Sequence, residues 1–361
     1  MQKTVATGTI RLNVDRNDTG RDLHELLDIA ARANPKRGFL IVSTLIGRHL
    51  PTTPAVMRSV MRGLAIRIPA DLPGPVLFLG MAETAVGLGQ GVHDAWRNCT
   101  GRVDAHFIQS SRQTCPEMDL WATFEEGHSH ATSHLVHMPV NVDTIKSCRS
   151  LVVVDDECST GTTFLTVEEA MIPLLPRLER VIDVVITEWS RDEARHRVSL
   201  VSGTMDWSPN GELGEVPGSS PNAHGKTSPG AAPGRQGYDR HPGLPNVTVP
   251  EFEEGARIAV IADGENAYDA LLIAELLERN GAITTIQSIT RSPAHVGGAM
   301  ATRAILSDAH GSGASCYAYN LEVSRPEKIV LVVEIEGAQA EEMARQTSVG
   351  RENIHMIKVT R

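Results

Sequence analysis

Residues 151–166 of this chain read LVVVDDECSTGTTFLT. The run starts with an unbroken apolar stretch rich in β-branched residues, which predicts a strand buried on both faces in a parallel sheet. Asp155 and Asp156 follow directly, and a turn rich in hydroxyl groups comes next. Ligands of open α/β sheets bind at the carboxyl ends of strands, so we expect a ligand site here.

The turn consists of Ser159, Thr160, Gly161, Thr162 and Thr163. Its hydroxyls, its glycine and the free N–H groups of the next helix can hold a phosphate. Asp155 and Asp156 can accept hydrogen bonds from the vicinal hydroxyls of a ribose. A phosphorylated sugar thus explains why acids stand beside a phosphate cradle. The alternative is a turn that only caps a helix, although capping needs one such residue rather than a pair of acids and several hydroxyls.

This order of strand, acidic pair and Thr-Gly-x-Thr turn resembles the 5-phosphoribosyl-1-diphosphate (PRPP) motif of type I phosphoribosyltransferases. The chain departs from the commonest members at Glu157 and Cys158, where those carry apolar residues. The resemblance implies an α/β fold with a parallel sheet flanked by helices. It also implies Mg²⁺, which prefers oxygen ligands from phosphates, water and a few carboxylates, here Asp155 and Asp156.

Four other stretches resemble one subfamily, the phosphoribosyltransferases of tellurite-resistance gene clusters that carry a C-terminal TRSP domain. They are residues 39–51 (FLIVSTLIGRHLP), 80–85 (GMAETA), 125–132 (EEGHSHAT) and 290–293 (TRSP). The resemblance covers most of the chain outside one linker. It implies more about PRPP than about the acceptor.

Length and charge set broad limits. A chain of 361 residues exceeds the size at which one core keeps growing, so two domains are expected. The net charge of −10 argues against a general surface for nucleic acid or anionic membranes. We find no signal-like start and no membrane-spanning apolar run, which predicts a soluble, cytoplasmic protein. A homodimer is compatible with the sequence.

We predict a phosphoribosyltransferase domain at 1–203, a Gly/Pro/Ser-rich linker or arm at 204–255, and a smaller Rossmann-like α/β domain at 256–361. Expected strands are 8–15, 39–42, 76–79, 106–110, 180–187, 257–262, 283–289 and 328–335. Expected helices are 22–33, 54–66, 168–178 and 268–279.

Further site candidates lie at other strand ends. By the resemblance, Arg48 and Arg112 would grip pyrophosphate, although the turn around Arg48 is also ordinary loop composition. Acceptor-binding candidates are Glu83, Thr84, Arg291 and Ser292. The alternative for Glu83 is a place in the first turn of a surface helix, where its charge suits the dipole.

Residues from about 115 to 132 show little apolar periodicity, which indicates a functional lid or a disordered loop. The histidines clustered there could transfer a proton to or from an acceptor base, and we predict catalytic roles for Glu126, His128 and His130. Metal binding by His128, His130 and His134 is the alternative, but no carboxylate or cysteine completes a familiar closed site.

The C-terminal domain resembles a worn copy of the first. Residues 258–265 align without a gap under 76–83, which places Glu265 under Glu83. Each segment is followed by a Gln-Ser pair and an arginine, Arg112 in one and Arg291 in the other. Residues 330–337 repeat the third strand and its acids without the hydroxyl turn. Short α/β units also resemble one another by physics alone. A true repeat predicts the same strand order in both domains.

The function expected from this sequence is transfer of a 5-phosphoribosyl group from PRPP to a nucleobase-like acceptor, with release of pyrophosphate. Two alternatives stay open. One is a PRPP-sensing regulator that keeps the cradle without catalysis. The other is an interaction or scaffold protein of a biosynthetic or stress-resistance cluster.

Overall fold

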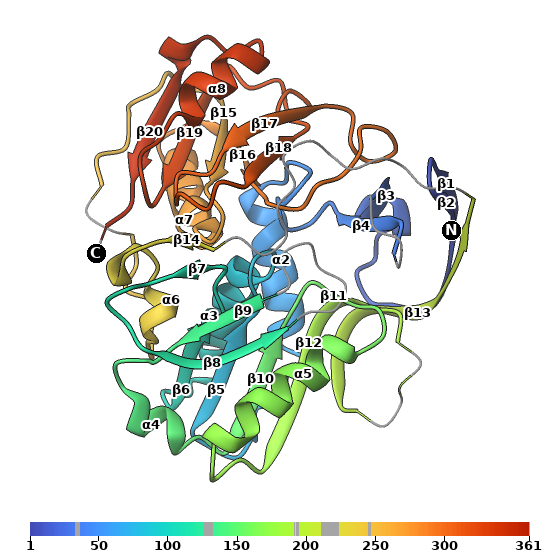
Figure 1. Cartoon of the computed structure of the whole chain (residues 1–361), viewed down its shortest axis with the longest axis vertical. Helices are drawn as coiled ribbons and strands as arrows, with labels where there is room; N and C mark the ends of the chain where they lie inside the picture. The colour runs from blue at the N-terminus through green and yellow to red at the C-terminus, as the bar shows by residue number, and fades with distance from the viewer. Residues whose placement is uncertain are drawn as a thin grey trace.

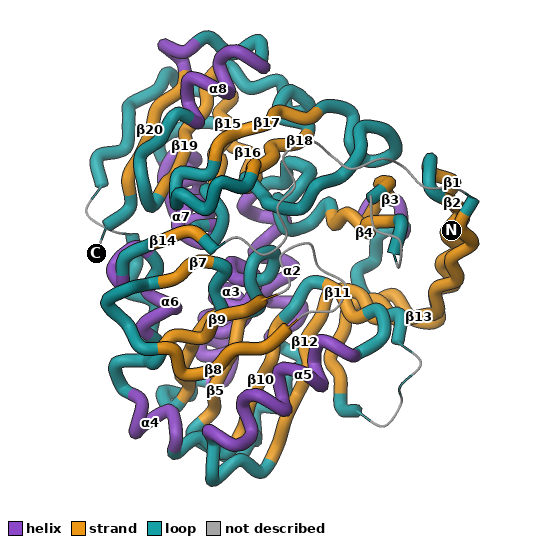
Figure 2. The backbone as a smooth tube through the Cα atoms, viewed as in Figure 1, coloured by secondary structure: helices purple, strands orange, loops and turns teal. Residues whose placement is uncertain are grey.

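The computed structural model describes residues 1–32, 37–125, 133–190, 192, 195–210, 224–244 and 247–360. Two α/β halves lie against each other, the N-terminal half below and the C-terminal half, orange to red, above it (Figure 1). The colouring by secondary structure shows helices beside the strands of both halves (Figure 2). No helix within the described ranges is long and apolar enough to cross a membrane.

The N-terminal sheet has the order β1-β2-β13-β12-β10-β5-β6. Its strands are β1 (Gln2–Val5), β2 (Gly8–Asn17), β13 (Arg197–Pro209), β12 (Arg180–Glu188), β10 (Ser150–Val154), β5 (Val76–Gly80) and β6 (Ala105–Gln109), and β11 (Glu157–Cys158) pairs with β12. The strands from β13 to β6 are parallel, whereas β2 runs antiparallel to β13. The apolar runs of β5 and β10 are fully buried, as their sequences predict.

The C-terminal sheet has the order β16-β15-β19-β20, all parallel. Its strands are β15 (Arg257–Ala262), β16 (Ile283–Ser288), β19 (Lys328–Val333) and β20 (Ile354–Lys358). The first three coincide with predicted strands.

The two sheets share one plan, which confirms the strand order that the repeat predicts. The series β12-β10-β5-β6 in the first half matches β20-β19-β15-β16 in the second. An antiparallel hairpin follows the edge strand in each: β8 (Leu120–Glu125) with β9 (Ser133–His137), and β17 (Arg303–Ser307) with β18 (Ser315–Tyr319). Even the isolated bridge just past the edge strand recurs, Ser111 with Leu135 and Thr290 with Tyr317.

The pairing register defines equivalent residues. Gly80 pairs with Gln109, while Ala262 pairs with Ser288. Three residues after each pair stand Glu83 and Arg112 in the first half, and Glu265 and Arg291 in the second. The two Gln-Ser pairs are offset by one residue, because Gln109 is level with Ser288 rather than with Gln287.

Helices join the halves. The helix after β5 is α3 (Val86–Thr100), and the helix after β15 is α7 (Ala267–Arg279); these two pack together. A Cβ at Gly87 would lie only 2.8 Å from the Cβ of Ala267, so the absence of a side chain at 87 permits this close contact. α2 (Pro54–Ala65) packs on α3 and begins at Thr53, whose hydroxyl accepts from the N–H of Val56.

The predicted helix at 22–33 is wrong. Among its described residues, 22–32, the helix is limited to α1 (Leu23–Leu26). β3 (Leu27–Ala31) follows it and pairs antiparallel with β4 (Phe39–Ser43). Main-chain N–H groups of the C-terminal domain also bind this strand, since Ala299 donates to Ile29. The strand partners outweigh the local helical spacing of the leucines.

Other boundaries differ from the predictions. β7 (Gln113–Thr114) precedes the aperiodic segment and β8 lies within it, so the described part of that segment includes a strand. The helix predicted at 168–178 is α5 (Thr162–Met171), followed by the 3₁₀ turn η1 (Ile172–Leu174). The other short helices are α4 (Val142–Lys146) and α8 (Gln339–Gln346), and two further 3₁₀ turns are η2 (Pro229–Ala231) and η3 (Arg351–Asn353).

The segment expected as a linker contains regular structure. β13 extends to Pro209, and further on β14 (Gly225–Lys226) pairs with β7 while α6 (Pro233–Gln236) packs near β6. We call residues 224–244 the arm. Figure 1 shows β14 and α6 at the junction between the two halves. The described part of this segment thus contacts both halves.

Candidate active site

A cavity of about 140 Å³ lies where the carboxyl ends of the N-terminal strands meet the β3–β4 hairpin and the C-terminal domain. Its charged lining consists of Arg32, Arg37, Arg48, Arg112, Arg291, Glu83, Asp155, Asp156 and Glu157. Residues 290–292 reach it from the C-terminal half. A pocket of this composition suits an anionic ligand that also carries hydroxyl groups.

The acidic pair lies in this cavity, as the sequence predicts. Asp155 and Asp156 directly follow β10, and the N–H of Asp156 donates to the Asp155 carboxylate over 2.9 Å. Glu157, at the position that departs from the common motif, forms an ion pair of 2.6 Å with Arg37. Burial raises the pKa of Glu157, although the charge of Arg37 opposes that rise.

The hydroxyl turn lies immediately beyond the acids but does not line the cavity. Gly161 adopts a φ of +84°, which favours glycine, and α5 begins at the next residue. The hydroxyls of Thr160 and Thr162 lie 3.0 Å apart. Ser159 and Thr163 belong to the same turn. The structure therefore leaves the phosphate role of these five residues as a prediction.

Arg48 and Glu83 form an ion pair inside the cavity. Arg48 also donates to the carbonyl oxygen of Gly264 over 3.0 Å, so its buried guanidinium bridges the two halves. Thr84 follows Glu83 in the lining. The alternative of Glu83 as a surface-helix residue is wrong, because its side chain is only 12% exposed, lies among these partners and precedes α3.

Two equivalent arginines enter the cavity from the two halves. Arg112 donates to the carbonyl oxygens of Ser133 (2.9 Å) and Ala82 (3.3 Å). Arg291 lines the cavity beside Ser292, and its main-chain N–H donates to Glu83 over 3.3 Å. The C-terminal domain is thus part of the site and not only attached to it.

Glu126, His128 and His130 lie outside the described residues, so their predicted roles stay predictions. The neighbouring His134 is described and lines the cavity. Its ring stacks on Phe124 with centroids 4.6 Å apart, and Nδ1 lies 3.0 Å from the hydroxyl of Ser110. Within the described ranges, no group of three or more His, Cys, Asp or Glu side chains could hold a metal ion.

Sequence reasoning missed Arg32, Arg37 and His49 as lining residues. The sequence places Arg32 near the end of a predicted helix and Arg37 in the turn that follows it. Recognition of the antiparallel pair β3–β4 would have placed both arginines at the cavity. Burial, together with the charges of Arg48 and Arg32, lowers the pKa of His49 to about 3. His49 is therefore neutral at physiological pH.

Acids and guanidinium groups lie together at the carboxyl ends of the parallel strands of an α/β protein, a combination that suits a phosphorylated, hydroxyl-bearing ligand. A family model described as phosphoribosyl transferase matches residues 26–209, and the model of the TRSP domain that lies C-terminal to it matches 245–347. The first match spans just over half of the chain. This chain belongs to the phosphoribosyl transferase family, and its parallel sheet flanked by helices confirms the predicted fold class.

Solved structures with some similarity include two enzymes. Adenine phosphoribosyl transferase from Trypanosoma brucei, in complex with AMP, pyrophosphate and ribose-5-phosphate, is 13% identical with a TM-score of 0.33; the match covers 49% of this chain and 76% of that one. Adenine phosphoribosyltransferase from Rhodothermus marinus DSM 4252 is 13% identical with a TM-score of 0.32, covering 50% and 96%. Likeness at this level carries no argument about function. A search of curated proteins found no match.

Proposed function

We propose that the chain transfers a 5-phosphoribosyl group from PRPP to a nucleobase-like acceptor and releases pyrophosphate. The observation that carries this proposal is that Asp155 and Asp156 share one cavity with five arginines, in a member of the phosphoribosyl transferase family. Carboxylates suit the ribose hydroxyls, and guanidinium groups suit the phosphates.

In this reaction the bond between the anomeric carbon and pyrophosphate breaks, and its electron pair leaves with pyrophosphate. A nitrogen of the acceptor forms the new bond and gives up its proton. Positive charge therefore develops on the sugar and negative charge on the leaving group. Asp155 and Asp156 would hold and stabilise the sugar, while Arg48 and Arg112 would hold the pyrophosphate, so catalysis is positional and electrostatic.

Mg²⁺ fits the donor set, because Asp155 and Asp156 present carboxylate oxygens to a cavity that phosphates would share. When bound there, it would neutralise part of the charge of the leaving pyrophosphate. Ser159 to Thr163 would take the 5-phosphate. Thr84, Arg291 and Ser292 would face the acceptor beside Glu83, and His128 or His130 would take its proton with Glu126 nearby.

The test is to incubate the protein with PRPP, Mg²⁺ and a panel of nucleobases and to measure pyrophosphate. We expect release that depends on one base and is lost in Asp156→Asn. Thr160→Val should weaken PRPP about ten-fold or more, because one hydrogen bond to a charged group is removed. PRPP binding without turnover for any base would favour the sensing regulator, and no PRPP binding would refute the proposal.

A further inference from the structure

The two halves hold each other through equivalent carboxylates. Glu83 of the first half accepts from the main-chain N–H of Arg291 in the second, at 3.3 Å. Glu265 of the second half accepts from the main-chain N–H of Arg112 in the first, at 2.6 Å. The register makes these two contacts counterparts. The glutamate that follows β5 thus holds the turn after β16 in the other half. The glutamate that follows β15 holds the turn after β6 in the same way.

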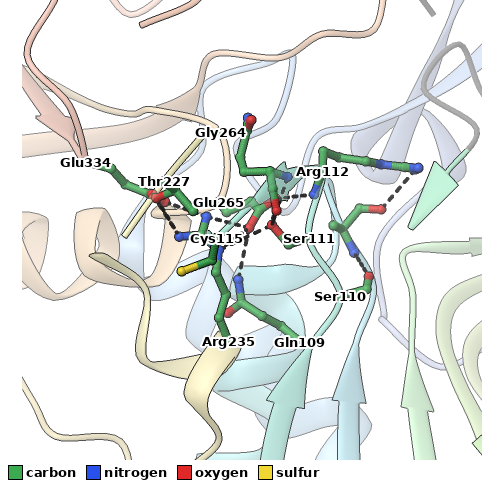
Figure 3. A network of polar contacts seen from close by, with 12 residues as sticks. Gln109, Ser110, Ser111, Arg112, Cys115, Thr227, Arg235, Gly264, Glu265 and Glu334 are labelled. Atoms are coloured by element: carbon green, nitrogen blue, oxygen red, sulfur yellow. Dashed lines mark hydrogen bonds and ion pairs between the residues drawn. The ribbon is translucent and has the colours of Figure 1, made fainter. Parts of the chain in front are cut away.

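The second of these contacts has more donors. Glu265 also accepts from the hydroxyl of Ser111 at 3.0 Å and from the side-chain amide of Gln109 at 3.2 Å, so three residues around one turn converge on it (Figure 3). The carboxylate is almost fully buried. Hydrogen bonds from several donors to a buried charge fix its position strongly.

The arm supplies the counter-charge. Arg235, in α6, is fully buried and donates to Glu265 over 2.7 Å and to Glu334 over 2.8 Å. Figure 3 shows its guanidinium between the two carboxylates. Glu334 is two residues past Val332, which pairs with Ala262, and Asp156 is two residues past Val154, which pairs with Gly80. Arg235 therefore occupies the C-terminal counterpart of the place between Glu83 and Asp156.

We propose that Glu265, fixed by Arg235, is a positioning residue that holds the Ser111–Arg112 turn so that the Arg112 guanidinium faces the PRPP cavity. The inference rests on the proposed function, since it assigns Arg112 to the pyrophosphate of PRPP. It adds that residues outside the cavity, from the C-terminal domain and the arm, set the affinity of the N-terminal site.

The geometry explains why this turn needs such support. A rotation of the peptide between Ser111 and Arg112 would carry the guanidinium away from its carbonyl partners on Ser133 and Ala82. Leu135 holds Ser111 through main-chain bonds, and His224 Nδ1 of the arm lies 2.9 Å from the Arg112 carbonyl oxygen. Glu265 binds the N–H of Arg112 itself, over 2.6 Å.

The test compares Glu265→Gln with the unchanged protein, in the full chain with Mg²⁺, by calorimetric titration of PRPP and of ribose 5-phosphate. The amide keeps the size of the side chain but loses the charge and one acceptor. We expect the Kd of PRPP to rise about ten-fold or more, while the Kd of ribose 5-phosphate changes less than two-fold, because only PRPP carries the pyrophosphate.

Two further variants keep the test decisive. Glu275→Gln removes another ion pair between the halves, Arg58 with Glu275 at 2.6 Å, which touches neither the turn nor the cavity lining; it should leave both Kd values unchanged. Arg235→Lys keeps the charge but loses the two-pronged contact, and should raise the Kd of PRPP by less than Glu265→Gln does. It serves in place of Glu265→Gln if that variant does not fold.

Three outcomes would overturn the inference. An unchanged Kd of PRPP in the variants, with the unchanged protein binding PRPP, would refute it and leave the proposed function intact. A proportional loss of both ligands would show a merely structural role. Failure of the unchanged protein to bind PRPP would refute both the proposed function and this inference.

Discussion

The equivalent position at the strand ends is an open cavity in the N-terminal half and is filled by an arginine side chain in the C-terminal half. In the N-terminal half, Glu83 and Asp156 line a cavity with several arginines. In the C-terminal half, the counterparts Glu265 and Glu334 are closed over Arg235, whose side chain is fully buried. One backbone plan thus surrounds an arginine-lined cavity in one half and a buried cluster of ion pairs in the other.

The pKa shifts of Arg235 and Glu334 agree with a buried cluster of ion pairs that links the two halves. Burial alone would raise the pKa of Glu334, but the adjacent Arg235 lowers it below its ordinary value. The same carboxylates raise the pKa of Arg235 against its burial. The region after β19 also lacks the hydroxyl turn that follows the first acidic pair. At this position the C-terminal half therefore has neither the open space nor the hydroxyl-rich turn of the first.

The largest expected effect comes from removal of the buried cation. Arg235→Met would leave Glu265 and Glu334 buried without their counter-charge, which typically costs about 3–5 kcal/mol of unfolding free energy. The matched control is Arg58→Met, whose partly exposed pair with Glu275 should cost about 1 kcal/mol or less. Urea unfolding of both variants measures the difference. Equal, small losses of unfolding free energy in the two variants would show that the ion pairs of Arg235 do not hold the halves together.

A second prediction concerns pH. His310 Nε2 lies 3.4 Å from Asp263, and Nδ1 lies 3.1 Å from the carbonyl oxygen of Lys226 in the arm. Burial lowers the pKa of His310, but Asp263 and Glu334 outweigh it and raise the pKa to about 10. The pKa of His310 is therefore higher in the folded than in the unfolded protein, so the charged imidazolium stabilises the folded state. This contribution to the unfolding free energy is complete below about pH 6.5 and is lost as the pH rises toward 10.

The measurement is the unfolding free energy of the unchanged protein and of His310→Gln at several pH values between 6 and 10. The gap between the two should shrink as pH rises, by about 1.4 kcal/mol for each unit by which the pKa is raised. A gap that stays constant across this range would show that His310 carries no charge in the folded state.

A smaller effect is expected on PRPP affinity, which should depend on the acids after β10 and not on those after β19. Asp156→Asn should weaken PRPP by about 1.5–3 kcal/mol, because a hydrogen bond to a charged group is lost. The control is Glu336→Gln, an exposed member of the acidic residues after β19, which should leave PRPP affinity unchanged. Calorimetry with Mg²⁺ gives both values. Equal affinities of the two variants would remove Asp156 from the site.

The sequence was sufficient to predict most of the two sheets. Their strands are apolar runs whose burial follows from composition, and the repeat of β5 in β15 correctly predicted a shared strand order. Where the predictions failed, contacts distant in sequence decide the structure. β3 forms because β4 and residues near Ala299 pair with it, although Leu23, Leu26 and Leu27 have helical spacing.

The site shows the same division. Asp155, Asp156, Arg48 and Arg112 could be predicted because each follows a recognisable strand. Arg235 could not, since its Gly- and Pro-rich surroundings predict a solvated linker and its two carboxylate partners lie 30 and 99 positions further along the chain. Only the fold brings these charges together.

The most direct test of the contrast between the halves is the stoichiometry of PRPP binding to the full chain with Mg²⁺, measured by calorimetry. An open site in one half and a closed position in the other predict one PRPP per chain, with binding strongly weakened in Asp156→Asn. Two PRPP molecules per chain, or one that persists unchanged in Asp156→Asn, would contradict this account.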